Sequence, residues 1–187
     1  MFICPHGVRW RPLRRLKLAV SCCENQGGRP QRRSRTNQDI ASLSFLVNLP
    51  FYHAGDGLGL GGQIINGISA DDAVLWLWTT NGHLPNSCGI VEHWGFRYVT
   101  MLTWTKHKMG MGDWLRGKTE HCLMCVKGKP AVTLTNQTTS LLANAGAHSQ
   151  KSNQFYALVE QLCPGSKVEM FQRRTRPGWV GHEDESR

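Results

Sequence analysis

An apolar run in the first third of the chain ends in a segment whose residue types could do chemistry. Residues 44–52 read SFLVNLPFY, so Asn48 closes the apolar run, and Pro50 and two aromatic residues follow it. Many enzymes end the strand that carries a catalytic loop with an amide, a proline and an aromatic ring. The question is whether Asn48 to Phe51 form such a loop or only share its composition.

Three further polar segments are expected near one crevice, because ligands of an open α/β sheet bind outside the carboxyl ends of its strands. They are TTN at 79–81, KHK at 106–108 and QRR at 172–174. Each also has a simple structural explanation. The first can cap a helix, the second can be a solvated loop, and the third can be a surface edge. Only together do they indicate a binding site.

A glycine-rich basic loop at 106–118 is the candidate contact for nucleic acid. Its cations are Lys106, Lys108, Arg116 and Lys118. Trp104 and Trp114 are interleaved with these cations, and proteins grip a single strand by such a combination of charge and stacking. A mobile lid with a buried tryptophan at each end explains the same pattern, and both interpretations stay open.

The elements that must position these residues follow from hydrophobic periodicity. The expected strands are 71–80, 97–106, 120–128 and 167–174, and the expected helices are 86–96 and 151–163. Residues 131–147 are expected to be a loop or an irregular arm. Strands that alternate with helices at this spacing predict an α/β fold with a mainly parallel sheet.

The charge of the chain is concentrated at its N-terminus. The formal net charge is +9 over 187 residues, and residues 1–36 hold nine Lys and Arg but a single acid. We therefore expect residues 1–41 to be a basic, disordered arm and residues 42–187 to be one domain. The arm could bind nucleic acid, target the protein to an organelle, or be a tail without a task.

The remaining composition narrows the class of protein. No run approaches 18 apolar residues, so we expect no membrane span and an intracellular protein. Cys122 and Cys125 form a single CxxC in a strand-like run. Alternation along a strand sends these two thiols to opposite faces, so we expect buried core thiols and no metal site.

Five blocks of the sequence, taken in order, resemble the adenine-N(6) methyltransferases related to the catalytic subunit of the messenger-RNA methyladenosine writer, above all their short bacterial and phage members. The blocks are ADDAVLWLWTTNGHLP, WGFRYVTMLTWTK, GMGDWLRGKTEHCLMCVKGKP, HSQK…FY…VEQLCPG and VEMFQRRTRPGW. The resemblance covers about residues 50–183. It implies a Rossmann-like fold with helices on both faces of the sheet, and S-adenosylmethionine as the methyl donor. It also implies the 6-amino group of adenine in DNA or RNA as the acceptor, and a homologous methyltransferase subunit as a potential partner.

The resemblance assigns cofactor residues to two regions. In the family, a lysine of a gate loop lies beside the methionine part of the cofactor, and Lys151 matches it, with His148 nearby. A cation there can pair with the cofactor carboxylate. A glutamate of the last strand and an arginine four residues later lie around the ribose, and Glu169 and Arg173 match them. A carboxylate is a suitable acceptor for ribose hydroxyls.

Two positions depart from the family pattern. After the Pro-Gly-Trp, the family has Gly-Asn-Glu or Gly-Asn-Gln, which holds the sugar and adenine end of the cofactor. Here the matching residues are Gly181, His182 and Glu183, so His182 replaces the asparagine. Ser152 replaces the proline that follows the gate-loop lysine. The cofactor site implied by the resemblance is therefore altered at both places.

The catalytic tetrapeptide of the family is Asp-Pro-Pro-Trp at the end of a strand. Its acid and backbone carbonyls accept hydrogen bonds from the target amine, and its aromatic ring stacks on the base. Asn48-Leu49-Pro50-Phe51 is a candidate version, but Tyr52 lies only 20 residues before Asp72. The family spacing then places the motif within 25–40, where no such tetrapeptide occurs. Spacing thus favours a chance likeness between Asn48–Phe51 and the catalytic tetrapeptide. In that case, the chain is either an inactive family member or one with a displaced start.

Overall fold

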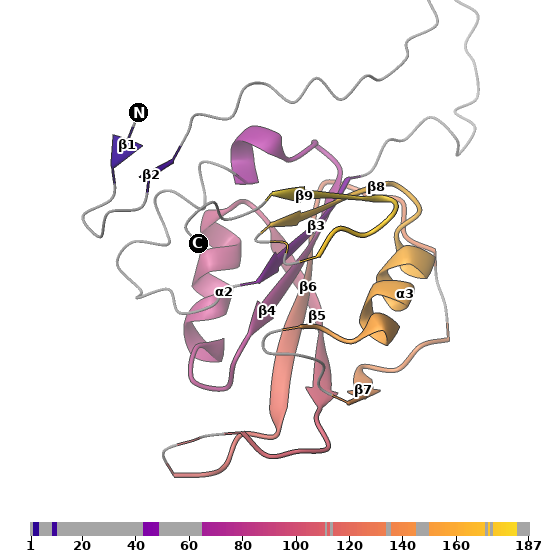
Figure 1. Ribbon diagram of the computed structural model, residues 1–187. Coiled ribbons are helices and arrows are strands. Elements are labelled where there is room, and N and C mark those ends of the chain that lie inside the picture. The colour runs from indigo at the N-terminus through magenta and orange to yellow at the C-terminus, as the bar shows by residue number, and fades with distance from the viewer. Residues whose placement is uncertain are drawn as a thin grey trace, which may run out of the picture.

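The central feature of the computed structural model is a seven-stranded sheet with helices on both faces (Figure 1). The structure describes residues 2–3, 9–10, 43–48, 65–110, 112, 114–133, 136–144, 150–170, 172 and 174–182. The strands of the sheet are β3 (Leu43–Asn48), β4 (Ala73–Thr79), β5 (Arg97–Thr105), β6 (Thr119–Lys127), β7 (Ser140–Leu142), β8 (Ser166–Met170) and β9 (Trp179–His182). The sheet confirms the predicted α/β class.

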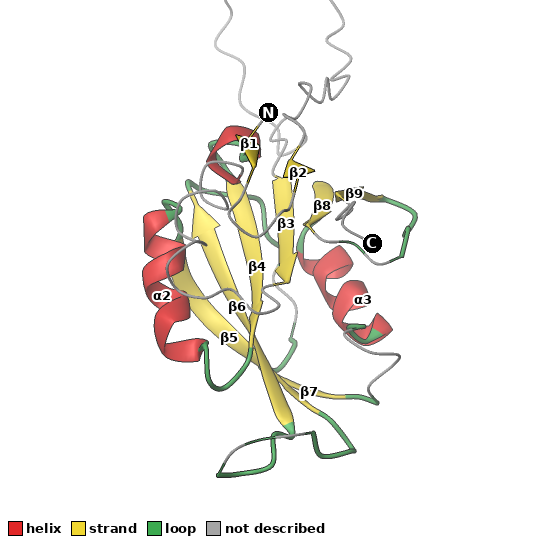
Figure 2. Ribbon diagram, turned by 60° about the vertical axis from the view of Figure 1, so that its left-hand side comes forward, coloured by secondary structure: helices red, strands yellow, loops and turns green. Residues whose placement is uncertain are grey.

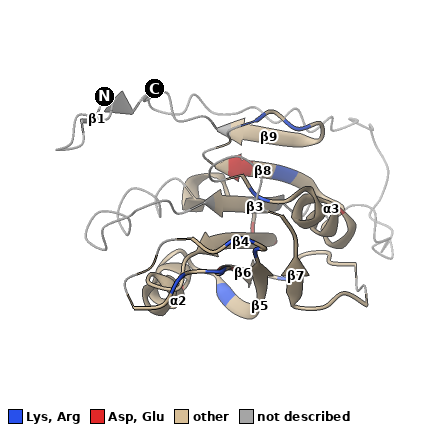
Figure 3. Cartoon of the chain, turned by 60° about the horizontal axis from the view of Figure 1, so that its bottom comes forward, with Lys and Arg blue, Asp and Glu red and all other residues tan. Residues whose placement is uncertain are grey.

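The order of the strands is β7-β5-β6-β4-β3-β8-β9. Figure 3 shows this succession from β9 through β3 to β5. β3 is parallel to both of its neighbours, β4 and β8, and only β6 runs against the other strands of this sheet. The carboxyl ends of β3, β4, β5 and β8 therefore meet at one edge, which we call the carboxyl edge. In open α/β sheets this edge is where ligands bind.

The two faces of the sheet are covered by α2 (Leu84–His93) and α3 (Asn153–Leu162), which lie on opposite sides in Figure 2. All seven residues of β4 are buried, as a strand covered on both faces requires. Leu75 and Leu77 pack with Val91 of α2, whereas Trp76 and Trp78 pack with the face of α3. The alternation of side chains along β4 thus divides the core into two layers.

Local sequence explains where the two helices begin and end. α2 has a proline in its first turn and stops at Gly95, whose φ of 75° suits a residue without Cβ. α3 begins at Ser152, whose side chain accepts a hydrogen bond from the Phe155 amide at 3.3 Å. Phe155 and Val159, at helical spacing, are fully buried against β4.

Several predicted bounds need correction. The interval 131–147 is not wholly irregular, because β7 lies within it and pairs with β5. The strand expected over 167–174 ends at Met170, and a further strand, β9, follows it. Both corrections concern short edge strands, whose pairing depends on neighbours that are distant in sequence.

Other features fall outside the main sheet or concern single side chains. β1 (Phe2–Ile3) and β2 (Arg9–Trp10) form a separate two-stranded pair, and the rest of the N-terminal arm lies outside the described residues. Cys122 packs in the α3 layer and Cys125 in the α2 layer, which confirms that the two thiols face opposite sides. Among the described helices, none is long and apolar enough to cross a membrane.

Candidate active site

The central strand of the sheet, β3, delivers Asn48 to the carboxyl edge. Asn48 lies opposite Trp78 of β4, and Val47 lies opposite Met170 of β8. The chain therefore leaves β3 between the ends of two parallel strands. The spacing argument placed the catalytic strand before residue 41, yet the sheet has its central strand at Leu43–Asn48. Pro50 and Phe51 lie outside the described residues, and Asn48 is described only by its backbone.

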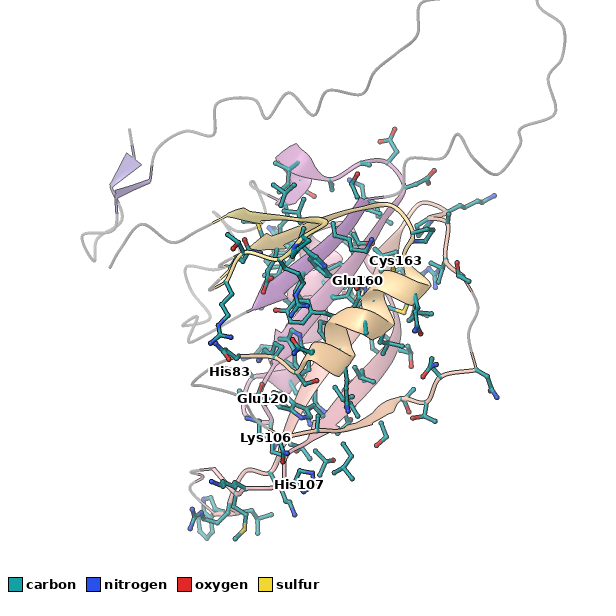
Figure 4. The ribbon with its side chains drawn as sticks, turned by 45° about the vertical axis from the view of Figure 1, so that its right-hand side comes forward. His83, Lys106, His107, Glu120, Glu160 and Cys163 are labelled. Carbon is teal, nitrogen blue, oxygen red and sulfur yellow. The ribbon has the colours of Figure 1, made fainter. Side chains whose placement is uncertain are left out.

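Beside the end of β4, one carboxylate joins two lysines. Lys151 Nζ lies 2.6 Å from Glu120 Oε2, and Lys106 Nζ forms an ion pair with Glu120 Oε1. The Lys151 ammonium also lies 4.5 Å from the ring centroid of Trp78. Figure 4 shows Lys106 and Glu120 next to each other at the base of the loop that carries His107. We call Lys106, Glu120 and Lys151 the lysine–glutamate cluster.

The lysine–glutamate cluster carries a surplus positive charge. Burial alone would raise the pKa of Glu120, but Lys151 and Lys106 outweigh burial and hold the pKa below its usual value. One carboxylate between two ammonium groups leaves a net charge of +1. The cluster can therefore accept a further anion, and the half-buried setting strengthens that attraction relative to water.

On the other side of β3, a buried carboxylate lies against α3. Tyr156 donates a hydrogen bond of 2.8 Å from its hydroxyl to Glu169 Oε1, and Glu169 is almost fully buried. Burial raises the pKa of Glu169, while the bond from Tyr156 acts in the opposite direction. Arg176 stacks on the Tyr156 ring at 3.8 Å. The carboxylate is thus held in place as a hydrogen-bond acceptor.

Gln172 follows β8 and places its side-chain amide beside Glu169, where the amide opposes the rise in the pKa of that carboxyl. Its side chain is only 8% exposed, and its Nε2 has no regular hydrogen bond to any described residue. Gly181 of β9 makes room for it, because a Cβ at Gly181 would lie 1.5 Å from Gln172 Oε1. Acceptor and donor together suit a group with hydroxyls.

A third network fixes the ends of β4, β5 and β6 relative to one another. His121 Nε2 lies 2.7 Å from Asn81 Oδ1, and His121 Nδ1 lies 3.1 Å from Thr103 Oγ1. Burial lowers the pKa of His121, and Glu120 opposes this effect. A neutral ring that donates from Nε2 and accepts at Nδ1 fits both partners. Asn81, predicted as part of the crevice, is thus a structural anchor at the carboxyl edge.

Comparison with known proteins shows the family to which the chain belongs. Residues 63–184, more than half of the chain, match the MT-A70 model and include β4, β6 and β8. The chain belongs to the MT-A70 family. It is 34% identical over 116 residues to the type II methyltransferase M.MunI of Mycoplasma sp, a match that covers 60% of this chain and 50% of that protein.

Two eukaryotic MT-A70 relatives agree with this placement. The chain is 30% identical over 122 residues to the N(6)-adenosine-methyltransferase catalytic subunit METTL3 of Homo sapiens, covering 59% of this chain and 21% of that protein. It is 29% identical over 120 residues to an N(6)-adenosine-methyltransferase MT-A70-like protein of Arabidopsis thaliana, covering 58% and 18% respectively. The chain thus spans half or less of these relatives.

The MT-A70 positions assigned by resemblance are partly brought together. Lys151 and Glu169 lie at the carboxyl edge on either side of β3. His182 is the last residue of β9 and pairs with Met170, but only its backbone is described. The positions outside the described residues are His148, Arg173 and Glu183.

Sequence reasoning missed two side chains of the candidate site, Glu120 and Tyr156, and it named Gln172 within the crevice segment at 172–174 without its neighbours. Glu120 was hidden because it follows a loop and meets Lys151 only through the fold. Tyr156 looked like one more apolar residue of α3, and its partner Glu169 is 13 residues away. Gln172 stood in a polar run with two arginines. Its later position beside Gly181 could not be read from that run.

Proposed function

We propose that this protein is an S-adenosylmethionine-dependent methyltransferase that acts on the 6-amino group of adenine in DNA or RNA. Membership of the MT-A70 family supports methyl transfer, and the chain's similarity to N(6)-adenosine-methyltransferases of Homo sapiens and Arabidopsis thaliana supports adenine as the acceptor. The observation that carries the proposal is the exit of the chain from β3. The end of β3 at Asn48 lies between the lysine–glutamate cluster and Glu169.

The described residues fit the cofactor at two points. The surplus charge of the lysine–glutamate cluster suits the amino-acid carboxylate of the cofactor, with Lys151 as its direct partner. Glu169 and the amide of Gln172 beside it suit the hydroxyls of its ribose. Bound there, S-adenosylmethionine supplies a methyl group on a positively charged sulfur. The further cofactor residues that we propose from the resemblance are His148, Arg173, His182 and Glu183.

The catalytic task that we assign to Asn48 is to accept a hydrogen bond from the amino group of adenine. This amine is a poor nucleophile because its lone pair is delocalised into the ring. Acceptors on its N–H groups shift the nitrogen toward tetrahedral geometry and leave the lone pair free for in-line attack. For Pro50 and Phe51 we propose the roles that the resemblance implies: the proline restricts the backbone of the loop, and the ring stacks on the base.

The β5–β6 loop is the proposed contact for the acceptor strand. Lys108, Arg116 and Lys118 are exposed and free to meet phosphates. Lys106 is bound to Glu120, so it links this loop to the cofactor side instead. The proposal therefore keeps Lys106 within the site but gives it a positioning role.

Methyl transfer tests the proposal directly. The purified chain is incubated with isotope-labelled S-adenosylmethionine and adenine-containing DNA and RNA oligonucleotides, and 6-methyladenine is measured by mass spectrometry after digestion. Loss of one preorganised hydrogen-bond partner typically costs about 10²- to 10³-fold in kcat. We expect that loss for Asn48→Ala. The exposed Asn136→Ala, on a distant connection, is the matched control and retains full activity.

Cofactor binding separates the two ways in which the test can fail. Calorimetry with S-adenosylmethionine is carried out on the wild-type protein and on Lys151→Ala. Binding without product identifies a family member that is catalytically inactive, as the altered tetrapeptide and His182 would favour. The absence of both cofactor binding and methylated product overturns the proposed function. Product that survives in Asn48→Ala removes Asn48 from the catalytic loop.

A further inference from the structure

The described residues between β5 and β6, which are 106–110, 112 and 114–118, form a hairpin held by hydrogen bonds across it. Lys106 N donates to Lys118 O at 2.8 Å, and Gly110 N donates to Gly117 O at 2.6 Å. The Arg116 guanidinium adds a bond of 2.9 Å to Gly110 O. These bonds extend the β5–β6 pair beyond the sheet, where it projects at the bottom of Figure 1. We call residues 106–118 the hairpin.

The tip of the hairpin exposes large apolar side chains. Trp114 is 99% exposed and Leu115 is 86% exposed, and Met109 adds a further 61%. The other tryptophans with described side chains are all buried: Trp76, Trp78, Trp94, Trp104 and Trp179. The lid interpretation, with a buried tryptophan at each end, is therefore wrong at Trp114. A cluster of exposed apolar side chains is typical of a surface that binds a ligand or a partner molecule.

The charge around the tip identifies the kind of ligand. Lys108, Arg116 and Lys118 are exposed on the hairpin, and Asp113 is the only acid in its sequence. Cores of protein–protein interfaces are depleted of lysine. An aromatic ring among cations is instead the combination with which proteins hold unpaired nucleic acid, by stacking on bases and by charge on phosphates.

The hairpin leaves the sheet at the carboxyl edge. Thr105 pairs with Thr119 at its base, and Thr79, at the end of β4, pairs with His121 two residues further along β6. Two strand spacings, about 10 Å, separate β6 from the central strand β3. The base of the hairpin therefore lies on the same edge of the sheet as the end of β3, where the proposed catalytic loop begins.

We propose that Trp114 stacks on a base that has left its helical stack, while Lys108, Arg116 and Lys118 hold the neighbouring phosphates. The inference rests on the proposed function for the identity of the bound strand as the methyl acceptor. An enzyme that modifies a base must reach it outside the duplex. The unstacked base comes from a single strand or from a duplex that opens locally.

Fluorescence anisotropy with labelled oligonucleotides tests the inference on the full chain. A single strand and its perfect duplex, both containing adenine, are titrated against wild-type protein, Trp114→Ala and Trp114→Phe. Stacking of one base makes a tenfold or greater loss for Trp114→Ala the expected result. Trp114→Phe keeps a flat ring and should restore most of the affinity. Circular dichroism checks that each variant is folded.

Matched controls separate stacking from charge and from general surface effects. Leu142→Ala removes another exposed apolar side chain, on β7, and should leave affinity unchanged. Lys118→Ala should weaken binding and reduce the dependence of log K on log salt by about one unit. Lys129→Ala removes an exposed lysine beyond the opposite end of β6 and should have neither effect.

The outcomes assign the contact or overturn it. A loss confined to the single strand assigns the contact to unpaired strands, and an equal loss on the duplex assigns it to a base that leaves the stack. Unchanged affinity in Trp114→Ala overturns the inference. The inference is also overturned if light scattering shows that the wild-type protein is a dimer and Trp114→Ala is a monomer, while nucleic-acid binding is unaltered. A Trp114-dependent affinity without any methylated product supports the hairpin contact and defeats only the proposed function.

Discussion

Glu120 is the residue that connects the hairpin to the segment before α3. It binds Lys106 at the base of the hairpin and Lys151 before α3. Neither lysine is fully exposed, so each depends on this carboxylate for neutralisation. If the proposed cofactor binds at Lys151, its carboxylate competes with Glu120 for that lysine, and the ion pair of Glu120 with Lys106 changes as a result.

Glu120→Gln should lower the stability of the folded chain. The amide leaves two partly buried ammonium groups without a counter-charge, and hydrogen bonds to charged groups contribute about 1–3 kcal/mol. We expect a loss of that size in the unfolding free energy measured by urea titration. Glu92→Gln, on the exposed face of α2, is the control and should change little. Equal stabilities for the two variants would show that the cluster is solvated.

His121 should make stability depend on pH. Burial lowers its pKa in the folded state, so the unfolded chain binds the proton first as the pH falls. Its contribution is fully present above the unfolded pKa of about 6.5 and is lost as the pH falls toward the lower folded pKa.

Urea midpoints at pH 8 and pH 5.5 measure this dependence. The wild-type protein should lose more stability between these two pH values than His121→Asn does. His93→Gln, on the exposed surface of α2, should titrate like the wild type. A His121→Asn profile identical to that of the wild type would show that His121 is not the group responsible.

At the scale of elements, local pattern predicted what is buried and failed where pairing is set by distant segments. The apolar run of β4 and the helical spacing of α3 predicted both elements. β7 and β9 were not predicted, because their three or four residues become strands only through pairing with β5 and β8. The hairpin looked mobile because glycine-rich sequence does not reveal that its backbone bonds close across it.

In the candidate site too, local sequence identified some residues, whereas contacts between distant segments could not be predicted. Lys151 and Glu169 could be placed by resemblance to a family motif, but their partners Glu120 and Tyr156 could not. Both partners lie in other elements, so the fold alone brings them together. The spacing argument placed the catalytic strand before residue 41, and whether Asn48 to Phe51 form the catalytic loop stays a prediction. β3 is the central strand, and that is a property of its neighbours.

Two glycines should respond in opposite ways to alanine. Gly128, after β6, has φ of 62°, and a Cβ there would lie 2.4 Å from the Asp71 carbonyl oxygen. Gly128→Ala should cost about 1–3 kcal/mol. Gly89, within α2, has open space around its Cα. Gly89→Ala should stabilise the fold by about 0.5–1 kcal/mol. Thermal unfolding of both variants measures the contrast, and a shift of the same sign in each would contradict it.

At the scale of the whole molecule, residues before Leu43 contribute nothing to the seven-stranded sheet among the described elements. A chain of residues 42–187 should therefore keep the circular dichroism spectrum and the melting temperature of the full protein. A chain of residues 50–187 lacks β3, which leaves β4 and β8 with unpaired edges and apolar faces. We expect this shorter chain to aggregate.

Size-exclusion chromatography of the two truncated chains checks this boundary. Soluble, monodisperse 42–187 together with aggregated 50–187 supports a domain that begins at β3. Aggregation of both chains would show that the N-terminal arm takes part in the fold. A folded 50–187 would show that β3 is dispensable, and would remove Asn48 from the centre of the site.

The position of β3 also sets the order in which the protein assembles as it is made. Leu43 pairs with Ala73 on one side and with Ser166 on the other, so the second pairing must wait for more than a hundred further residues. Contacts between such distant segments form slowly, because closing the long intervening loop costs entropy before the contacts can stabilise the fold. β3 to β6 can pair on the ribosome, whereas β8 and β9 join last. The Glu169 side of the candidate site therefore forms only after β8 has been made.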